Sequence, residues 1–282
     1  MLKRDDLAVK NLGVPQYDSP LDGFTNTKEH KIKYISDEDR FLFLSSEKKL
    51  NEYVEKLKNK KDDEEIIPSF EKAGPRQKIY FKPGETISAV VTCGGLCPGL
   101  NSVIRALVYM NYYRYNNRLM YGIRYGYEGF IDKYDHSIIN LTPDVVENIH
   151  KLGGTILGSS RGPQNEDEIV DKLVKLKVNI LYVIGGDGTL RGASKIVEAI
   201  ERRNLKISVI GIPKTIDNDI AYIDKSFGSE TAFSKACTAI ESAHTEAKGA
   251  MNGIGIVKVM GRHSGFIAAN ATLATNDVNF VL

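Results

Sequence analysis

The sequence has few cysteines, little net charge and no long apolar run, and each shortage excludes a class of protein. Its 282 residues hold three cysteines, too few for the disulfide framework of a small secreted domain. A signal peptide and an apolar run of membrane-spanning length are both missing. The formal net charge is +2, and no basic block with interleaved aromatic residues follows residue 84. We therefore expect a cytoplasmic protein with no membrane and no nucleic-acid partner.

Cys93 and Cys97 are separated by three residues, and no second pair of metal ligands stands nearby. A structural zinc site needs such a second pair at a recognisable spacing, so we expect ordinary core or loop thiols. Apolar residues make up 42% of the chain and charged residues 26%, which is enough to bury one large core or two modest ones.

The composition changes near residue 84. Residues 1–84 are polar and lysine-rich, and the stretch 45–65 reads as one exposed helix with acidic and basic residues at helical spacings. We expect this part to be a solvated N-terminal extension.

After it, units of strand, glycine turn and helix recur. The first is a strand at 87–95 followed by a helix with Val103, Leu107 and Met110 at helical spacing behind a Ser or Asn cap. Further strands are expected at 178–186, 207–215, 253–262 and the terminal VNFVL, with helices at about 189–203, at about 229–247 and over SGFIAANATLA. Apolar strands that alternate with helices indicate a parallel sheet covered on both faces, so the expected fold class is α/β.

The expected strands end on chemically unusual residues. The ends are TCGGLCPGLN (92–101), GSSRGPQ (158–164), GGDGT (185–189), PKTIDND (213–219) and MGRHSG (260–265). Ligands of such sheets collect beyond the carboxyl ends of the strands, so we expect the functional site there.

In GGDGT, the glycines allow backbone N–H groups to approach an oxyanion, and a helix that opens near Thr189 adds its positive N-terminal end. A lone carboxylate, Asp187, would repel phosphate unless a divalent cation stood between them. Asp187 is therefore expected to bind Mg²⁺ on a nucleotide phosphate, directly or through water. A plain glycine turn is the alternative.

In PKTIDND, Asp217 and Asp219 are two residues apart, so on an extended segment both leave the same face together with Thr215. One carboxylate then suits a general base that deprotonates a hydroxyl, and the other an electrostatic or metal partner. A loop held by Asx turns is the alternative.

Arg161 and Arg262 each stand beside a glycine, where a guanidinium suits phosphoryl oxygens. His263 is expected to be a packed or solvated residue and not a base.

Together the motifs resemble one family, the 6-phosphofructokinases. TCGGLCPGLN, GGTILGSSRGPQ, GGDGT, PKTIDND and KVMGRHSGF stand in that family's order and spacing, so the resemblance covers roughly 85–282. It implies a Rossmann-like, three-layer, parallel-sheet fold of two lobes. It also implies a cytoplasmic, allosteric homo-oligomer, dimer or tetramer, with Mg²⁺ as cofactor. Its reaction would transfer the γ-phosphoryl group of ATP to the C1 hydroxyl of fructose 6-phosphate in glycolysis.

The resemblance also implies roles for individual residues. Asp217 would be the general base, with Thr215 and Asp219 holding substrate and metal beside it, Arg161 spanning the transferred phosphoryl group and Asp187 holding Mg²⁺. The residues implied for the nucleotide are Gly95, Arg161, Gly186, Asp187, Gly188, Thr189 and Lys214. Those implied for the sugar phosphate are Thr215, Asp217, Asp219, Met260, Gly261 and Arg262.

Two positions bear on the phosphoryl donor. Pyrophosphate-using members of the family typically have Asp at the position of Gly188 and Lys at the position of Lys214. Gly188 leaves room for the α-phosphate of ATP, so the chain resembles the ATP-dependent branch of plants and protists that keeps the lysine. A pyrophosphate-dependent enzyme is the main alternative, and an NAD or lipid kinase that shares GGDGT is a distant one.

Two departures from the family pattern stand out. Bacterial members carry an arginine where this chain has Gly253, and the family continues well beyond the final VNFVL. We therefore expect a C-terminally truncated chain with a polar extension (1–84), a nucleotide-binding domain (85–228) and an incomplete sugar-phosphate domain (229–282).

Overall fold

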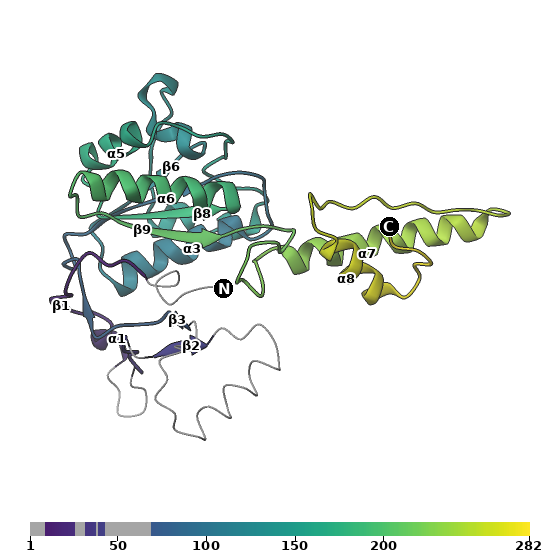
Figure 1. Ribbon diagram of the computed structural model, residues 1–282, viewed down its shortest axis with the longest axis horizontal. Coiled ribbons are helices and arrows are strands. Elements are labelled where there is room, and N and C mark those ends of the chain that lie inside the picture. The colour runs from purple at the N-terminus through teal and green to yellow at the C-terminus, as the bar shows by residue number, and fades with distance from the viewer. Residues whose placement is uncertain (1–8, 26–31, 38, 43–68) are drawn as a thin grey trace, which may run out of the picture. The chain divides into compact units, whose positions relative to one another are not determined.

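The computed structural model describes residues 9–25, 32–37, 39–42 and 69–282. The chain forms two compact units, Met1–Pro83 and Gly84–Leu282 (Figure 1). The helix expected at 45–65 lies outside the described residues. Within them, no helix is both long and apolar enough to cross a membrane.

The described part of the first unit consists of short elements. Two antiparallel pairs are formed by β1 (Tyr17–Asp18) with β4 (Lys78–Ile79) and by β2 (Arg40–Leu42) with β3 (Ser69–Glu71). A four-residue helix, α1 (Asp22–Thr25), follows β1.

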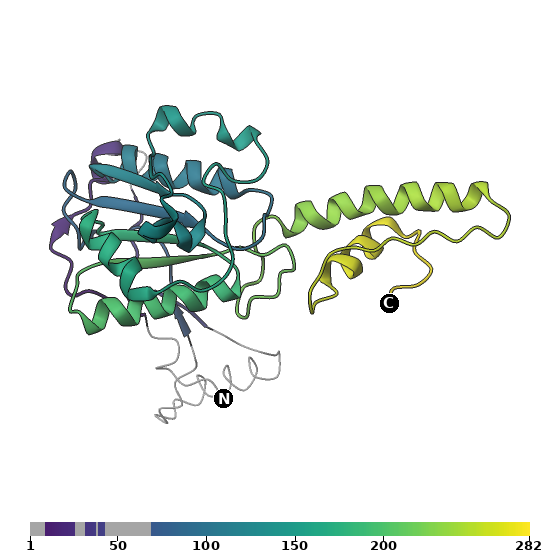
Figure 2. The ribbon, with the colours of Figure 1, turned by 90° about the horizontal axis from the view of Figure 1, so that it is seen from above.

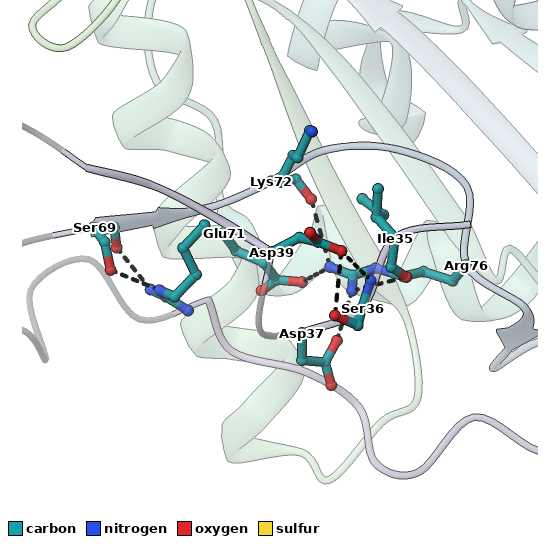
Figure 3. A network of polar contacts seen from close by, with 9 residues as sticks. Ile35, Ser36, Asp37, Asp39, Ser69, Glu71, Lys72 and Arg76 are labelled. Atoms are coloured by element: carbon teal, nitrogen blue, oxygen red, sulfur yellow. Dashed lines mark hydrogen bonds and ion pairs between the residues drawn. The ribbon is translucent and has the colours of Figure 1, made fainter. Parts of the chain in front are cut away.

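Arg76 joins two segments of this unit through charge (Figure 3). Its guanidinium lies 2.8 Å from Asp37 Oδ1 and 2.5 Å from Glu71 Oε1. Nearby, Asp39 accepts hydrogen bonds from the backbone N–H and the hydroxyl of Ser36, and these bonds lower the pKa of its carboxyl group. Polar contacts therefore hold the 35–39 segment against the 69–76 segment.

The second unit is built on a five-stranded sheet of order β7-β6-β5-β8-β9. The strands are β5 (Ile87–Thr92), β6 (Leu119–Ile123), β7 (Ile139–Asn140), β8 (Ile180–Gly185) and β9 (Ser208–Pro213). All neighbours are parallel except β6 and β7. The predicted α/β fold is thus confirmed, and so are the strands expected near 87, 178 and 207. β6 and β7 were not predicted from the sequence.

Helices cover both faces of this sheet (Figure 1). On β5, Ala89 and Val91 pack into one core cluster with helices α5 (Glu166–Lys175) and α6 (Asp187–Arg202). Val90 packs into the other cluster, beneath α3 (Leu100–Tyr109). Alternate residues of one strand therefore fill two cores, as the three-layer arrangement requires.

The start of α3 differs from the expected Ser or Asn cap. The capping residue is Gly99, with a φ of +99° and no side-chain cap. Asn101 instead donates to the carbonyl of Leu152 and accepts from the N–H of Ile156, so its amide holds a loop and not the helix end. The buried face of α3 also differs from the expected one, since Met110 is 45% exposed. The buried apolar positions of α3 are Leu100, Ile104 and Val108.

A π-helical segment, Met110–Arg114, continues α3. Asn111 is buried there, accepts from the hydroxyl of Ser88 and the amide of Asn117, and donates to the carbonyl of Leu107. Short connecting elements complete the core: the 3₁₀ helices Gly126–Phe130, Asp132–Tyr134 and Ile149–Lys151, and α4 (Pro143–Val146).

Two helices, α7 (Ser229–Gly249) and α8 (Phe266–Thr275), pack side by side (Figure 2). The strands expected at 253–262 and at VNFVL are wrong, because both segments are irregular. A strand needs a partner to complete its backbone hydrogen bonds, and no described strand lies alongside either segment. Ile254 and Ile256 are accordingly 85% and 86% exposed.

Candidate functional site

The turn after β5 is held against the loop at 158–161. Gly94 N donates to Ser160 O over 3.0 Å, and Ser159 Oγ donates to Gly94 O over 2.6 Å. This loop does not follow a strand, contrary to expectation, because the element before it is the 3₁₀ helix Ile149–Lys151. The hydrogen bonds, and not the chain order, bring the loop to the end of β5.

This pairing brings Arg161 to the glycine turn. A Cβ atom built on Gly95 would lie 3.3 Å from the Nη2 atom of Arg161, and one built on Gly94, whose φ is +83°, would lie 3.7 Å from Lys214 Nζ. Two cationic groups therefore approach the same short stretch of backbone. Glycine is needed there because side chains would fill the space between backbone and cations.

The GGDGT residues run from the last residue of β8, Gly185, into the first turn of α6. Gly186 is the N-cap and Asp187 is the first helical residue. The Asp187 side chain is 69% exposed, and its Oδ2 atom lies 2.5 Å from Arg191 Nη2, one turn along the helix. A Cβ atom on Gly188 would meet no atom within 4 Å. The helix thus presents one carboxylate and an open space beside it.

Thr189 anchors this first turn. Its side chain is buried, and its backbone carbonyl accepts a 2.8 Å hydrogen bond from the hydroxyl of Tyr127. Burial raises the pKa of Tyr127 well above its usual value, so this phenol stays a donor. The contact fixes where the N-terminus of α6 points.

Lys214 follows β9 and is only 5% exposed. Its Nζ atom donates to the carbonyl oxygen of Gly95 over 2.5 Å. Burial is the main cause that lowers the pKa of Lys214, and the charge of Arg161 lowers it further, while Asp217 acts in the opposite direction. The site therefore holds a partly desolvated cation at the carboxyl edge of the sheet.

The loop at 215–226 is a hydrogen-bonded turn. Thr215 Oγ1 accepts from the N–H of Asp217 over 3.1 Å and donates to Asp219 Oδ1 over 3.1 Å. The expected extended path is wrong, because Asn218 has a φ of +52°. Asn218 closes the turn by donating to Asp224 O and accepting from Ser226 N. The side-chain bond that spans two residues is made by Thr215, and the Asn218 bonds reach residues six and eight positions along the chain, so side chains hold this loop but not through Asx turns.

The 260–264 segment reaches the same loop. Ser264 Oγ donates to the carbonyl oxygen of Asp217 over 3.1 Å. Gly261 has a φ of +145°, and a Cβ atom there would lie 2.6 Å from Ser264 O. Met260 is 72% exposed, and Arg262 and His263 are exposed as well, which fits the expectation of a solvated histidine.

Three residues of this arrangement were missed in the sequence. Arg191 has a local signal, since it stands four residues after Asp187 on a helix. Ser226 Oγ accepts a hydrogen bond from the backbone N–H of Thr215 over 2.8 Å, and Ser264 bonds to a residue 47 positions away. No local sequence pattern indicates contacts between residues that are so far apart in the chain.

The side chains present suit a magnesium ion that binds together with phosphate. Among the described residues, no group of three or more His, Cys, Asp or Glu side chains could hold a metal ion. Mg²⁺ commonly takes one or two protein carboxylates and fills its remaining positions with phosphate oxygens and water. The exposed carboxylate of Asp187 fits that pattern.

All three cysteines are free. Burial raises the pKa of Cys93 to about 12 and that of Cys97 to about 11. Cys97 Sγ donates to the carbonyl of Phe227, which ties the glycine turn to the residues before α7. These thiols are packed structural groups.

Residues 87–282 match the protein family described as Phosphofructokinase. An ATP-dependent 6-phosphofructokinase of Borreliella burgdorferi is 48% identical over 277 residues, which are 98% of this chain and 60% of the relative. ATP-dependent 6-phosphofructokinase 7 of Arabidopsis thaliana is 55% identical over 213 residues, which are 76% of this chain and 43% of the relative. The chain thus spans no more than 60% of the length of these relatives.

Solved structures show the same fold. A phosphofructokinase from Saccharomyces cerevisiae aligns with a TM-score of 0.59 and 26% identity, over 68% of this chain and 28% of that one. A pyrophosphate-dependent phosphofructokinase from Marinobacter aquaeolei aligns with a TM-score of 0.55 and 22% identity, over 67% and 49% of the two chains. Because the fold is shared with a pyrophosphate-dependent enzyme, it does not by itself identify the phosphoryl donor.

Proposed function

Because this chain belongs to the phosphofructokinase family, we propose that it carries the nucleotide site and part of the sugar-phosphate site of an ATP-dependent 6-phosphofructokinase. The reaction transfers the γ-phosphoryl group of ATP to the C1 hydroxyl of fructose 6-phosphate. One observation carries the proposal: the Lys214 ammonium group lies 2.5 Å from the glycine turn and within electrostatic reach of both Arg161 and Asp217. Cations for a phosphoryl group and a carboxylate for a hydroxyl therefore share one edge of the sheet.

The base in this proposal is Asp217. Its peptide unit is held in the turn by Thr215, and its carboxylate is free to take the proton of the C1 hydroxyl as the phosphoryl group arrives. Asp219, held by the same threonine hydroxyl, orients the substrate beside it. Met260, Gly261 and Arg262 bind the sugar phosphate from the neighbouring segment.

The donor phosphates bind along the glycine turn and the N-terminus of α6. Arg161 and Lys214 neutralise the oxygens of the transferred group, and such positioned charge supplies most of the catalysis in phosphoryl transfer. Gly95, Gly186 and Thr189 provide close backbone approach and the helix end. Asp187 would hold Mg²⁺ together with phosphate oxygens, and the ion would supply further neutralisation of charge on the phosphate chain.

The donor is assigned to ATP from Gly188. Its Cβ position is open to 4 Å, which leaves room for the α-phosphate and the nucleoside. The curated relatives described above are named ATP-dependent. A second candidate is a pyrophosphate-dependent enzyme. The observation behind it is Lys214, because a buried cation at this position suits pyrophosphate as well as it suits ATP.

The proposal extends to the setting of the enzyme. Three free thiols support a reducing, cytoplasmic compartment. A homo-oligomer, dimer or tetramer, is part of the proposal because the family resemblance implies it. Division into a nucleotide domain (85–228) and a sugar-phosphate domain starting at 229 stays a prediction.

A donor comparison tests the function. The protein at its full natural length is assayed with fructose 6-phosphate and either MgATP or Mg-pyrophosphate, and fructose 1,6-bisphosphate is measured. We expect kcat/KM for ATP to exceed that for pyrophosphate by about 10²-fold or more, a difference of roughly 3 kcal/mol. A preference for pyrophosphate would replace the first candidate with the second, and no product with either donor would overturn both.

A further inference from the structure

The peptide groups on both sides of Asp217 are held by hydroxyl groups. On the N-terminal side, Asp217 N donates to Thr215 Oγ1, which belongs to the same loop. On the C-terminal side, Asp217 O accepts from Ser264 Oγ, which belongs to the segment between α7 and α8. One of the two restraints on the proposed base therefore comes from a different part of the chain.

The second restraint acts at a turn. The Asp217 carbonyl belongs to the peptide unit that leads into Asn218, whose φ of +52° lies in the left-handed region that asparagine adopts in turns. A hydrogen bond to this carbonyl limits rotation of the peptide and so holds the backbone from which the Asp217 side chain projects. Asn218 holds the other side of the turn through Asp224 and Ser226.

Packing alone does not fix the loop against the helices. A cavity of about 320 Å³ lies beside it, lined by Ile216 and Asn218 of the loop and by Phe233, Phe266 and Ile267 of α7 and α8. Open space of this size allows the loop to shift. The hydrogen bond from Ser264 therefore carries a restraint that tight packing would otherwise supply.

The position of Ser264 follows from the sugar-phosphate segment. Gly261 turns the chain with a φ of +145° and approaches Ser264 O so closely that a Cβ atom would lie 2.6 Å away. Met260, Gly261 and Arg262, the residues proposed to bind the sugar phosphate, thus share one tight turn with Ser264. Movement of that turn moves the hydroxyl that bonds to Asp217.

We infer that Ser264 is a positioning residue for the proposed base: its hydroxyl makes the orientation of Asp217 depend on the seating of the 260–264 turn. The inference rests on the proposed function, because it takes Asp217 as the base. Its consequence is that the base is correctly oriented when the sugar-phosphate turn is in place.

Three serine substitutions separate positioning from plain stabilisation. Ser264→Ala removes the hydroxyl, and Ser264→Thr keeps it. Ser242→Ala is the matched control, because Ser242 is exposed on α7 and its hydroxyl bonds only locally to Thr238 O over 2.9 Å. Each variant of the full-length enzyme is characterised by its kcat, its KM for each substrate, its Tm, and hydrogen–deuterium exchange of the peptide covering 215–226.

We expect Ser264→Ala to lower kcat by about 10-fold, since small misplacements of a reacting group cost one to two orders of magnitude. The KM for ATP and the Tm should stay at wild-type values, and exchange should rise in 215–226 but not in 87–92. Ser264→Thr should restore kcat, and Ser242→Ala should match wild type. Added to Asp217→Asn, the Ser264→Ala change should cause no further loss, because the group it positions is gone.

Either of two results would overturn the inference: a full kcat in Ser264→Ala, or a kcat loss that appears equally in the Asp217→Asn background. A lowered Tm with unchanged kcat would assign Ser264 to stability alone. If the wild-type enzyme transfers no phosphoryl group to fructose 6-phosphate, the proposed function fails, while the exchange measurement still decides whether Ser264 restrains the loop.

Discussion

The ammonium group of Lys214, after β9, donates a hydrogen bond to the carbonyl oxygen of Gly95, in the turn after β5, over 2.5 Å. In the sheet these two strands are separated by β8. The contact therefore passes across the end of β8 and lies at one side of the proposed phosphate site. It also places a charge where burial disfavours it, and the pKa of Lys214 is lowered as a result.

Replacing Lys214 should lower activity without lowering thermal stability at pH 7. A lysine whose pKa is lowered by folding destabilises the folded state below that pKa, and the penalty disappears as the pH rises toward the unfolded-state value. Lys214→Met should therefore have a Tm at pH 7 equal to or above that of wild type, with an advantage that shrinks as the pH approaches 10. Activity should fall by about 10- to 100-fold, because a phosphate-binding charge is lost.

Thermal melts at several pH values and steady-state kinetics check this prediction. Lys214→Arg is the control, since it keeps the charge in the same buried place. A Met variant that loses stability at pH 7 as strongly as at pH 10 would show that the hydrogen bond to Gly95, and not desolvation, dominates.

Gly188→Asp should abolish most ATP use without disturbing the fold. The Cβ position is open to 4 Å, so the side chain fits. Its carboxylate would repel the nucleotide phosphates, and we expect kcat/KM for ATP to fall by about 10²-fold or more. Gly188→Asn, of equal size and no charge, distinguishes repulsion from bulk. If both variants lose ATP use equally, bulk is the cause.

Asp217→Ser should remove the base and spare binding. We expect kcat to fall by about 10²- to 10⁴-fold, with nearly unchanged KM values. Asp224→Asn is the control, because Asp224 contributes a backbone carbonyl to the loop, through Asn218. Stopped-assay product formation measures both variants, and a Ser variant with most of its kcat would remove Asp217 from this role.

Asp187→Asn should weaken activity in a way that added Mg²⁺ partly restores. The amide keeps the shape and removes the ligand charge, so the metal-nucleotide complex binds less tightly. A titration of activity against Mg²⁺ should shift to higher concentration. Arg191→Gln is the comparison, since it removes the ion-pair partner and leaves the carboxylate. A loss in Asp187→Asn that no Mg²⁺ concentration changes would exclude the metal role.

The three thiols should differ in reactivity. With pKa values of about 12 and about 11, Cys93 and Cys97 are thiolate at about the 10⁻⁴ and 10⁻³ level at pH 8. Cys237 is less buried. Iodoacetamide should therefore label Cys237 first, and the other two only after unfolding. Mass spectrometry of digested protein identifies the labelled residue, and early labelling of Cys97 would contradict its packing against Phe227.

The sequence predicted those parts of the fold and site that depend on local pattern. Apolar runs identified β5, β8 and β9: β5 and β8 are largely buried and so need mostly apolar residues, and β9 has a similar sequence although it is partly exposed. The glycine-rich end of β8 identified Asp187, and the family resemblance identified Lys214; the structure brings both to the carboxyl end of the sheet.

Contacts between distant segments could not be predicted in this way. Arg161 reaches the glycine turn through Ser159 and Ser160, and Ser264 reaches Asp217, although no local pattern encodes either pairing. The segment at 253–262 has the alternation of a strand, yet a strand forms only beside a partner. The local sequence indicates which secondary structure a segment prefers, and tertiary contacts determine which one it adopts.

The position of β9 would allow the protein to lose activity by a local opening, without global unfolding. Among the described strands it lies at an edge of the sheet and is paired with β8 alone. Local opening of an edge strand costs less free energy than unfolding of the central strands. Detachment of β9 would carry away Lys214, the loop of Asp217, and Val209 and Ile212, which pack on the margins of the two cores, while the buried residues of β5, α3, α5 and α6 stay packed. Inactive molecules would then remain compact and helical, so their circular dichroism spectrum would resemble that of the native protein. Only a measurement on β9 itself would detect its detachment.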